Sequence, residues 1–329
     1  MRAVLCRSFD GIDAVTVENI APDEPGPGEV RVRAAAVGVN FADSLVAAGQ
    51  YQTRPDFPFS PGFECAGHID ALGPGVEGFE IGERVMAVMD YGAWREQVCV
   101  PAVHVYRLPE SMDFVTAAGF PVTYGTSHIG LDHRGGLKAG ETLLVHGAAG
   151  GVGLTAVEIG KAMGATVIAT AGGPEKVAVA LEHGADHGID YRSEDIRARV
   201  RDLTEGRGAD VIYDPVGGDV FDASMRCIAW GGRLLVVGFA AGRIPQAPAN
   251  LLLVKNIAAI GVYWSSHRER EPERLQQSFA DLFRLYEAGA LKPRIAETWP
   301  LEGAAEALRR LLSRKVAGKI VLTTGETAS

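Results

Sequence analysis

Residues 141–164 constrain the fold more than any other part of the sequence. An apolar run at Thr142–His146 leads directly into a glycine-rich segment at 147–153, and good helix formers continue from there to Gly164. This order of strand, tight turn and helix is the context that a dinucleotide-binding turn requires, because small residues let the backbone approach a pyrophosphate and the helix start offers N–H groups. The turn residues expected to contact a cofactor are Ala149, Gly150, Gly151 and Val152.

The glycines of this turn have the spacing G-x-x-G-x-x-G, not G-x-G-x-x-G. A glycine-rich turn that binds nothing is the alternative interpretation of such a pattern. We disfavour it, because a strand precedes the turn, a helix follows it and a second βα unit comes next in the chain.

The composition excludes several classes of protein. A chain of 329 residues is long enough for two domains. It carries 32 Lys and Arg against 41 Asp and Glu, with the basic residues scattered, so we expect neither nucleic acid nor a membrane surface as its main partner. No apolar run approaches the roughly 20 residues of a membrane helix. Four widely spaced cysteines and an N-terminus without signal-peptide features predict a cytoplasmic, reduced protein.

The first 120 residues are rich in short β-type runs, separated by turn signals such as Pro25-Gly26-Pro27-Gly28. The predicted strands are Ala3–Cys6, Ala14–Val17, Val30–Val39, Glu64–Leu72, Arg84–Met89 and Glu96–Val100. This pattern predicts a barrel-like or partly open β domain. One helix is expected at Phe41–Ala48, with Asn40 at its N-cap.

From about Pro121 the pattern changes to alternating strands and helices. The predicted strands are Thr142–His146, Thr166–Thr170, His187–Asp190, Asp210–Tyr213, Arg233–Gly238 and Ala258–Val262. The predicted helices between them are Leu154–Met163, Glu175–His183, Glu194–Leu203 and Val220–Cys227, and Gly164, Gly184 and Gly231 read as helix stops. A doubly wound parallel sheet is the economical fold for this order.

The last part of the chain does not continue that order. An amphipathic helix carrying Leu275, Phe279 and Leu282 is followed by a helix at Ala304–Leu312 and a strand at Lys319–Thr323. Since these elements cannot simply extend the parallel sheet, we assign them to the first domain. The predicted organisation is a Rossmann-like domain at 121–264, inserted into a domain made of 1–120 and 265–329.

Several motifs together resemble one known family. They are Gly38-Val39-Asn40-Phe41-Ala42-Asp43, Gly49-Gln50-Tyr51, Pro61-Gly62-Phe63-Glu64-Cys65-Ala66-Gly67, the segment from Val145 to Gly153, and Gly318-Lys319-Ile320-Val321-Leu322. The chain is similar in these to the zinc-independent quinone oxidoreductases of the medium-chain dehydrogenase/reductase superfamily. The resemblance implies a GroES-like catalytic domain beside the Rossmann-like domain.

The residues also bear on the use of zinc. Zinc-dependent members of that superfamily have Cys where this chain has Asn40, His where it has Phe63, and a lobe of four close cysteines that is missing here. Asn and Phe are not zinc ligands, so we expect no catalytic metal. Substrate activation would then come from hydrogen bonds, with Asn40 as one catalytic candidate. An ordinary N-cap is the alternative role for Asn40, and both roles are compatible.

The end of the second predicted strand bears on the choice of cofactor. A site for NAD places Asp or Glu there for the ribose, about 20 residues beyond the glycine turn. This chain has Ala171-Gly172-Gly173-Pro174 instead, with Lys176 at the next helix start. The resemblance implies that Lys176 and Tyr191 hold the 2′-phosphate of NADPH, and Gly172 is a further cofactor-binding candidate. A solvated surface lysine is the alternative for Lys176, but the missing acid favours NADPH over NAD.

The resemblance also implies the nicotinamide site. It places Thr123 beside the ring, Tyr51 over the ring from the other domain, and five strand-end residues near the carboxamide, namely Val237, Gly238, Phe239, Val262 and Tyr263. Half-buried packing is the alternative for Tyr51. No histidine is expected to be catalytic, and no G-x-S-x-G motif supports a serine hydrolase.

The sequence therefore predicts an NADPH-dependent oxidoreductase that reduces a quinone or similar conjugated carbonyl by hydride transfer without metal. One alternative is an enoyl or enone reductase, acting on free carbonyls or thioesters. Another is an NADPH-binding protein with a structural or RNA-binding role, against which the acidic charge weighs. The apolar, unguarded strand at Ala258–Val262 also predicts a homodimer, since such edges pair with other chains.

Overall fold

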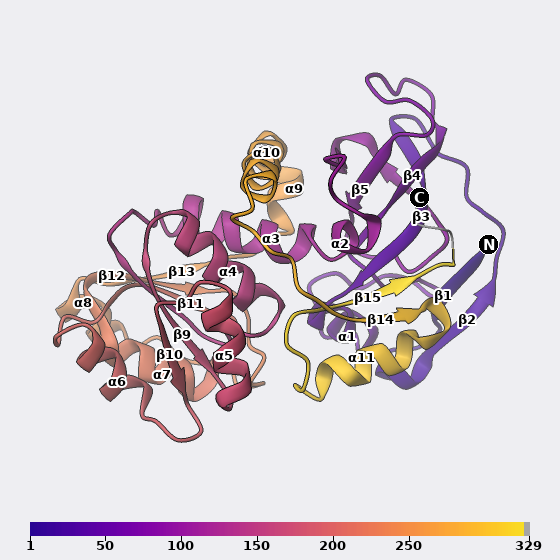
Figure 1. The fold of residues 1–329 in the computed structure, drawn as a ribbon. Coiled ribbons are helices and arrows are strands. Elements are labelled where there is room, and N and C mark those ends of the chain that lie inside the picture. Colours follow the sequence, from indigo (N-terminus) through magenta and orange to yellow (C-terminus); the bar gives the residue numbers. More distant parts are fainter. Residues whose placement is uncertain (326–329) are drawn as a thin grey trace. The chain divides into compact units, whose positions relative to one another are not determined.

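The computed structural model describes residues 1–325, which form two compact units (Figure 1). Unit 1 contains 1–122, 268–279 and the chain from Pro293 onward, and unit 2 contains 123–267 and 280–292. Residues 265–267 and 280–292 thus group with unit 2, whereas the sequence assigned them to the first domain, and residues 121 and 122 group with unit 1. In the part of the chain described, no helix has the length and apolar character to cross a membrane.

A seven-stranded sheet is the framework of unit 1 (Figure 1). Its strands follow the order β14-β15-β3-β4-β5-β7, and β6 pairs with β3. The bounds are β3 Glu29–Val39, β4 Glu64–Leu72, β5 Arg84–Val88, β6 Gln97–Pro101, β7 Val105–Arg107, β14 Ile295–Pro300 and β15 Lys319–Thr323. A separate antiparallel pair joins β1 (Arg2–Cys6) to β2 (Val15–Asn19). The six strands expected in the first 120 residues all form, and so does the final one.

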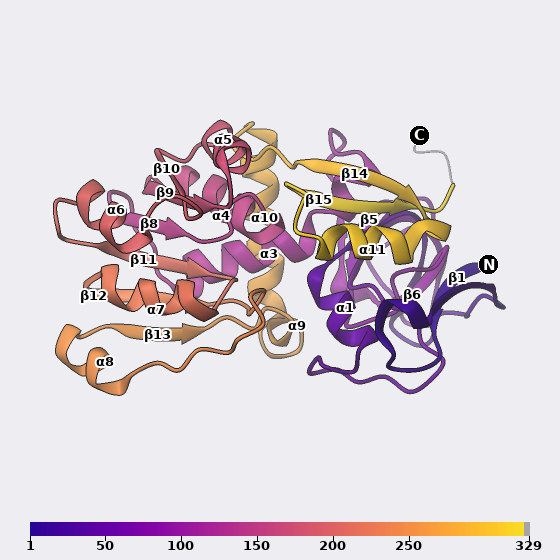
Figure 2. The same ribbon diagram turned by 90° about the horizontal axis from the view of Figure 1, so that it is seen from below.

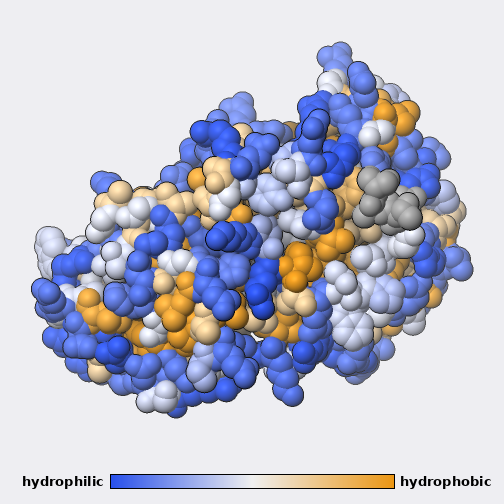
Figure 3. Space-filling view, viewed as in Figure 1, coloured by the Kyte–Doolittle hydropathy of each residue, from blue (hydrophilic) through white to orange (hydrophobic). Residues whose placement is uncertain are grey.

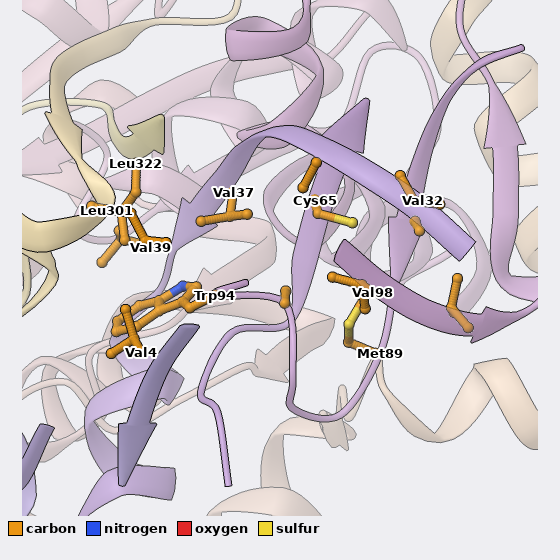
Figure 4. Packing of buried hydrophobic residues seen from close by; sticks show 14 of the residues in the cluster. Val4, Val32, Val37, Val39, Cys65, Met89, Trp94, Val98, Leu301 and Leu322 are labelled. Atoms are coloured by element: carbon orange, nitrogen blue, oxygen red, sulfur yellow. The ribbon is translucent and has the colours of Figure 1, made fainter. Parts of the chain in front are cut away.

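Trp94 occupies the centre of the unit 1 core and is fully buried. Figure 4 shows its ring among side chains of β1, β3 and the C-terminal elements, including Val4, Val39, Leu301 and Leu322. The indole Nε1–H donates to the carbonyl of Gly38 at 3.0 Å, which satisfies the one polar atom of the ring. The core therefore joins β3 to residues almost 300 positions later in the chain.

Short helices complete unit 1. The ones that lie wholly inside it are α1 (Phe41–Ala47), α2 (Phe114–Ala118) and α11 (Ala304–Leu312). Three more cross between the segments of the two units, namely α3 (Pro121–His128), α9 (Ser266–Arg270) and α10 (Pro272–Glu287). On the face drawn in Figure 3, apolar residues lie in small groups among polar ones.

Unit 2 is a six-stranded parallel sheet with the order β10-β9-β8-β11-β12-β13 (Figure 2). Its strands are β8 Thr142–Val145, β9 Thr166–Ala171, β10 His187–Asp190, β11 Ala209–Asp214, β12 Ile228–Val236 and β13 Ala258–Gly261. Its helices are α4 Gly151–Ala162, α5 Pro174–Glu182, α6 Ile196–Leu203, α7 Gly218–Cys227 and α8 Ala249–Lys255. The predicted doubly wound parallel sheet is confirmed.

Helices cover both faces of this sheet. One face packs against α6, α7 and α8, in an apolar cluster that includes Leu144, Ile168, Val200, Phe221 and Leu251. On the other face α4 approaches so closely that a side chain at Gly160 would meet Leu143 and Val167. Because neighbouring residues of a strand point to opposite faces, the strands are apolar on both sides, as parallel sheets require.

The prediction that Gly231 ends a helix is wrong. Helix α7 already ends at Cys227, and β12 begins at the next residue. The register of β12 on β11 shifts by several residues between Ile228 and Arg233, so the intervening segment bulges. Gly231 lies in this bulge with a φ of 75°, a conformation that favours glycine. Gly231 therefore marks an irregularity within a strand and not the end of a helix.

A buried histidine joins the middle of the sheet to α7. The His146 ring is fully buried, with Nδ1 2.9 Å from the Thr170 hydroxyl and Nε2 2.7 Å from the Ser224 hydroxyl. Since Ser224 donates to the carbonyl of Val220, it accepts from Nε2–H, and Nδ1 then accepts from Thr170. Burial lowers the pKa of His146, with Asp214 opposing it.

We predict that His146 makes unit 2 sensitive to acid. A lowered pKa means that the unfolded chain binds a proton first, so this contribution to stability is present above about pH 6.5 and is lost as the pH falls below it. Urea unfolding midpoints at pH 7.5 and 5.5 test this. His146→Gln should be less stable than the wild type at pH 7.5 and should lose less on acidification; an equal loss would contradict the assignment.

Candidate cofactor and substrate site

The glycine turn between β8 and α4 has the geometry of a phosphate cradle. Gly147 adopts a φ of 58°, and a Cβ at Gly153 would lie only 2.2 Å from the Gly147 carbonyl oxygen. A side chain at 153 is therefore excluded, and the first turn of α4 packs directly on the loop. Gly150 occupies the N-cap and carries no side chain to cap the helix, so the N–H groups of the helix start are left for a ligand.

Thr123 is brought to this turn by tertiary packing. A Cβ on Gly151 would lie 3.1 Å from the Thr123 methyl carbon, and the Thr155 hydroxyl of α4 donates to the Thr123 carbonyl at 3.1 Å. Thr123 is buried. Two residues that the sequence linked only through family resemblance thus lie side by side in unit 2.

The carboxyl ends of β11, β12 and β13 meet beside the turn. The Asp214 carbonyl accepts from Val237 N–H and Gly238 N–H, while Val262 N–H donates to the end of β12. Phe239 lies against Gly217, since a Cβ there would be 3.0 Å from its ring. Val262 is buried and Tyr263 is exposed. The predicted nicotinamide residues therefore share one edge of the sheet.

The end of β9 carries the predicted 2′-phosphate residues. A Cβ on Gly172 would lie 2.6 Å from the Tyr191 hydroxyl, so this phenol covers the glycine backbone. Arg192, which the sequence analysis missed, lies 3.2 Å from the same Cβ position, and its guanidinium forms no ion pair within residues 1–325. Lys176 is half-buried in the first turn of α5. A basic residue next to Tyr191 was the signal that could have found Arg192.

One carboxylate does lie close to these residues. Asp190, at the end of β10, accepts from Gly173 N–H at 2.8 Å and from Arg192 N–H at 3.0 Å through one oxygen. These backbone donors lower its pKa. The carboxylate thus shapes the loop through these backbone N–H groups, and its negative charge also interacts with Arg192.

In unit 1, Asn40 precedes α1, as predicted. The carboxylate of Asp43, in the first turn, accepts from Asn40 N–H at 2.6 Å and from Gly62 N–H at 3.1 Å. Burial raises the pKa of Asp43 to about 8, while the N–H groups of Asn40 and Gly62 and the charge of Lys319 lower it. Asp43 thus ties the start of α1 to the loop that carries the Pro61-Gly62-Phe63 motif.

The side chains at the zinc-ligand positions have other partners. The Asn40 carboxamide bonds to Glu64 and Lys319, and the buried Phe63 ring packs edge-on against Tyr51 with ring centroids 5.4 Å apart. An amide engaged in this way and a phenyl ring are not a donor set that zinc takes. Tyr51 also packs in an apolar cluster with Ala42 of α1, which places it near the helix that Asn40 begins.

Comparisons with known proteins identify the class. Residues 26–110 match the family model described as alcohol dehydrogenase GroES-like domain, and residues 151–282 match that of zinc-binding dehydrogenase. The chain is 40% identical to a quinone oxidoreductase-like protein 2 homolog of Nematostella vectensis, over 98% of this chain and 89% of that protein. It is 36% identical to a quinone oxidoreductase of Pseudomonas aeruginosa, over 96% and 97%.

The fold matches a solved structure of the same kind. The Escherichia coli quinone oxidoreductase, solved in complex with NADPH, superposes with a TM-score of 0.91 at 29% identity, covering 98% of this chain and 100% of that one. The fold and these relatives define a medium-chain dehydrogenase/reductase. Within that superfamily the chain belongs to the zinc-independent quinone oxidoreductases, as its motifs predicted.

We predict that Asp43→Asn destabilises unit 1. Both carboxylate oxygens accept from backbone N–H groups, and an asparagine can offer only one oxygen, so one buried donor loses its partner at a cost of about 1–3 kcal/mol. Thermal or urea unfolding above the pKa of Asp43, about 8, measures the effect, because Asp43 is then a carboxylate. The control is Asp113→Asn at the exposed N-cap of α2, where asparagine caps as well as aspartate. Equal stability of the two variants would contradict the assignment.

Proposed function

We propose that this chain is an NADPH-dependent oxidoreductase that reduces quinones or similar conjugated carbonyl compounds without a metal. Bound NADPH supplies a hydride. The observation that carries the proposal is the chemistry at the carboxyl ends of the strands in unit 2, which combines a glycine-rich cradle at 147–153 with the basic residues Lys176 and Arg192 near the end of β9. The relatives named as quinone oxidoreductases support the acceptor.

Each predicted cofactor residue has a role in the proposal. The backbone of Ala149, Gly150, Gly151 and Val152 binds the pyrophosphate at the start of α4. Gly172, Lys176, Tyr191 and Arg192 bind the 2′-phosphate. Val237, Gly238, Phe239, Val262 and Tyr263 receive the nicotinamide end, and Thr123 orients the ring.

Unit 1 supplies the remaining candidates. Tyr51 would cover the ring, and Asn40 would donate to the acceptor oxygen, on which negative charge develops as hydride arrives. A quinone needs little acid catalysis, because positioned donors stabilise that charge and water supplies the proton.

The proposal keeps the cytoplasmic location expected from the sequence. The free thiols of all four cysteines, each within the described residues, support this location.

We predict acceptor-dependent oxidation of NADPH. Purified protein should oxidise NADPH only when an acceptor is present, faster with small quinones than with an enone or an enoyl thioester, and the rate should survive exhaustive chelation. Absorbance at the nicotinamide band follows the reaction. A preference for the enoyl thioester would favour the enoyl reductase alternative, and tight NADPH binding without turnover on any acceptor would favour the structural one.

We also predict that the charge at the end of β9 sets cofactor preference. Lys176→Met and Arg192→Met should each weaken NADPH binding about ten- to hundredfold, the value of a hydrogen bond to a charged group, and should leave NADH binding little changed. Fluorescence titration with both cofactors measures this. Arg197→Met, at an exposed position on α6, is the control. An unchanged preference would remove the substituted residue from the site.

The proposed assembly is a homodimer paired through β13. This strand pairs only with β12 within residues 1–325, and Figure 2 shows it at the edge of the sheet with α8 beside it. Leu253 and Val254 of α8 are exposed. Lys255, the nearest charge in the sequence, donates to the Met225 carbonyl and is thus turned away from the strand, while Arg134 donates to the carbonyl of Gly261 at its end at 3.2 Å.

Ile260→Lys should therefore give a monomer. A charge in the middle of the edge opposes strand pairing across the interface, whereas Ile244→Lys, at an exposed loop position, should leave the dimer intact. Light scattering at micromolar concentration measures the mass. A wild-type mass near the 34.8 kDa of one chain would contradict the proposal.

A further inference from the structure

A buried ion pair between Glu64 and Lys319 lies where β3, β4 and β15 meet in unit 1. Lys319 Nζ lies 2.6 Å from Glu64 Oε1, and both side chains are almost completely buried. The second oxygen of Glu64 accepts from Val122 N–H at 2.8 Å. A buried ion pair is costly to desolvate, and simple apolar packing at these positions would do the same structural work. The pair therefore calls for another explanation.

The backbone around the pair is shaped to admit it. A Cβ on Gly38 would lie 2.2 Å from Glu64 Oε1, and a Cβ on Gly119 would lie 2.9 Å from the Lys319 stem. The register of β15 on β3 places Ile320 opposite Val39, which brings Lys319 beside Asn40. Two glycines and one strand pairing thus create the space in which both charges reach the same side chain.

That side chain is the Asn40 carboxamide. Asn40 Nδ2 donates to Glu64 Oε1 at 2.7 Å, and Asn40 Oδ1 accepts from Lys319 Nζ at 2.5 Å. Because a carboxylate only accepts and an ammonium only donates, the amide can take one orientation and not the flipped one. The second Nδ2–H has no acceptor within residues 1–325.

We propose that Glu64 and Lys319 are positioning residues for substrate reduction, which hold the Asn40 carboxamide so that its second N–H donates to the acceptor oxygen. The inference rests on the proposed function. Hydride from NADPH, carrying two electrons, adds to the conjugated acceptor and leaves NADP⁺; the displaced π pair moves onto the carbonyl oxygen, which then takes a proton from water. Asn40 stabilises the charge on that oxygen, and the ammonium on Oδ1 strengthens the amide as a donor.

The first experiment reads the orientation of Asn40 without turnover. The chain contains four asparagines, Asn19, Asn40, Asn250 and Asn256, so selective ¹⁵N labelling gives a simple set of side-chain NH₂ signals. Asn40→Asp identifies the Asn40 pair by its loss. This pair should exchange slowly with solvent in the wild type, and should shift and exchange faster in Glu64→Gln/Lys319→Met, which removes both charges of the ion pair together.

Matched controls separate the network from a general loss of charge. Lys315→Met and Glu77→Gln alter exposed residues of the same unit and should leave the Asn40 signals unchanged. Titration with NADPH should give the wild-type affinity for every variant. The reason is that the residues proposed to bind the phosphates of NADPH lie in unit 2. An Asn40 pair that is unaffected by the double variant would overturn the inference.

The second experiment is a mutant cycle on the reduction rate. Asn40→Ala should lower kcat about 10²-fold, the usual effect of losing a donor to a developing oxyanion, with the KM for NADPH unchanged. Glu64→Gln/Lys319→Met should lower kcat at least tenfold, and combining it with Asn40→Ala should cause no further loss. Additive losses would mean that the pair acts independently of Asn40 and would overturn the inference.

Rates measured with a series of quinones test positioning separately from a purely structural role of the pair. A purely structural role would lower the rate equally for every quinone. The loss in the double variant should grow as the quinone becomes less electron-poor, because such acceptors depend more on a hydrogen bond to the oxygen. An equal loss for every acceptor would also overturn the inference. Absence of turnover in the wild type with any acceptor would instead reject the proposed function, and the NMR experiment would still decide whether the pair orients Asn40.

Discussion

The parallel sheet of unit 2 is the constraint on which the cofactor site depends. The carboxyl ends of parallel strands all lie at the same end of the sheet. The loops after β8, β9, β11 and β12 therefore lie close together, however far apart they are in the sequence. The close approach of Gly153 to Gly147 then fixes how α4 starts, and hence where its N–H groups lie. Most of the proposed contacts at this edge are made by backbone, which explains why glycine and alanine dominate the motif.

Unit 1 is organised by a different constraint. Its sheet is completed by a strand from the far end of the chain, β15, which pairs with β3. The pairing delivers Lys319 to Asn40 and Glu64, and the same core holds Trp94 against Gly38. The hydrogen bond from Lys319 to Asn40 joins residues that are 279 positions apart. Such a site forms only when the whole unit is folded.

This difference decides how much could be predicted from the sequence. The β8-turn-α4 segment was predictable because its signal is local: an apolar run, closely spaced glycines and helix formers in succession. The N-cap position of Asn40 was equally local. Its hydrogen bonds to Glu64 and Lys319 were not predicted, since each charge looks ordinary in its own strand. A lysine at the start of an otherwise apolar strand was the available signal, because a buried lysine needs a partner.

Two other misses have the same origin. Arg192 follows Tyr191 in an exposed loop, where an arginine is unremarkable until the fold lays it over Gly172. Gly231 was assigned to a helix end because a bulge and a helix stop both call for a positive φ. In both cases the residue type indicated a local property, a surface charge or a positive φ. The role of the residue became clear only from the strand that lies beside it. Residues that act through backbone conformation are therefore visible in a single sequence, while residues that act through a distant charge become visible when strand pairing is known.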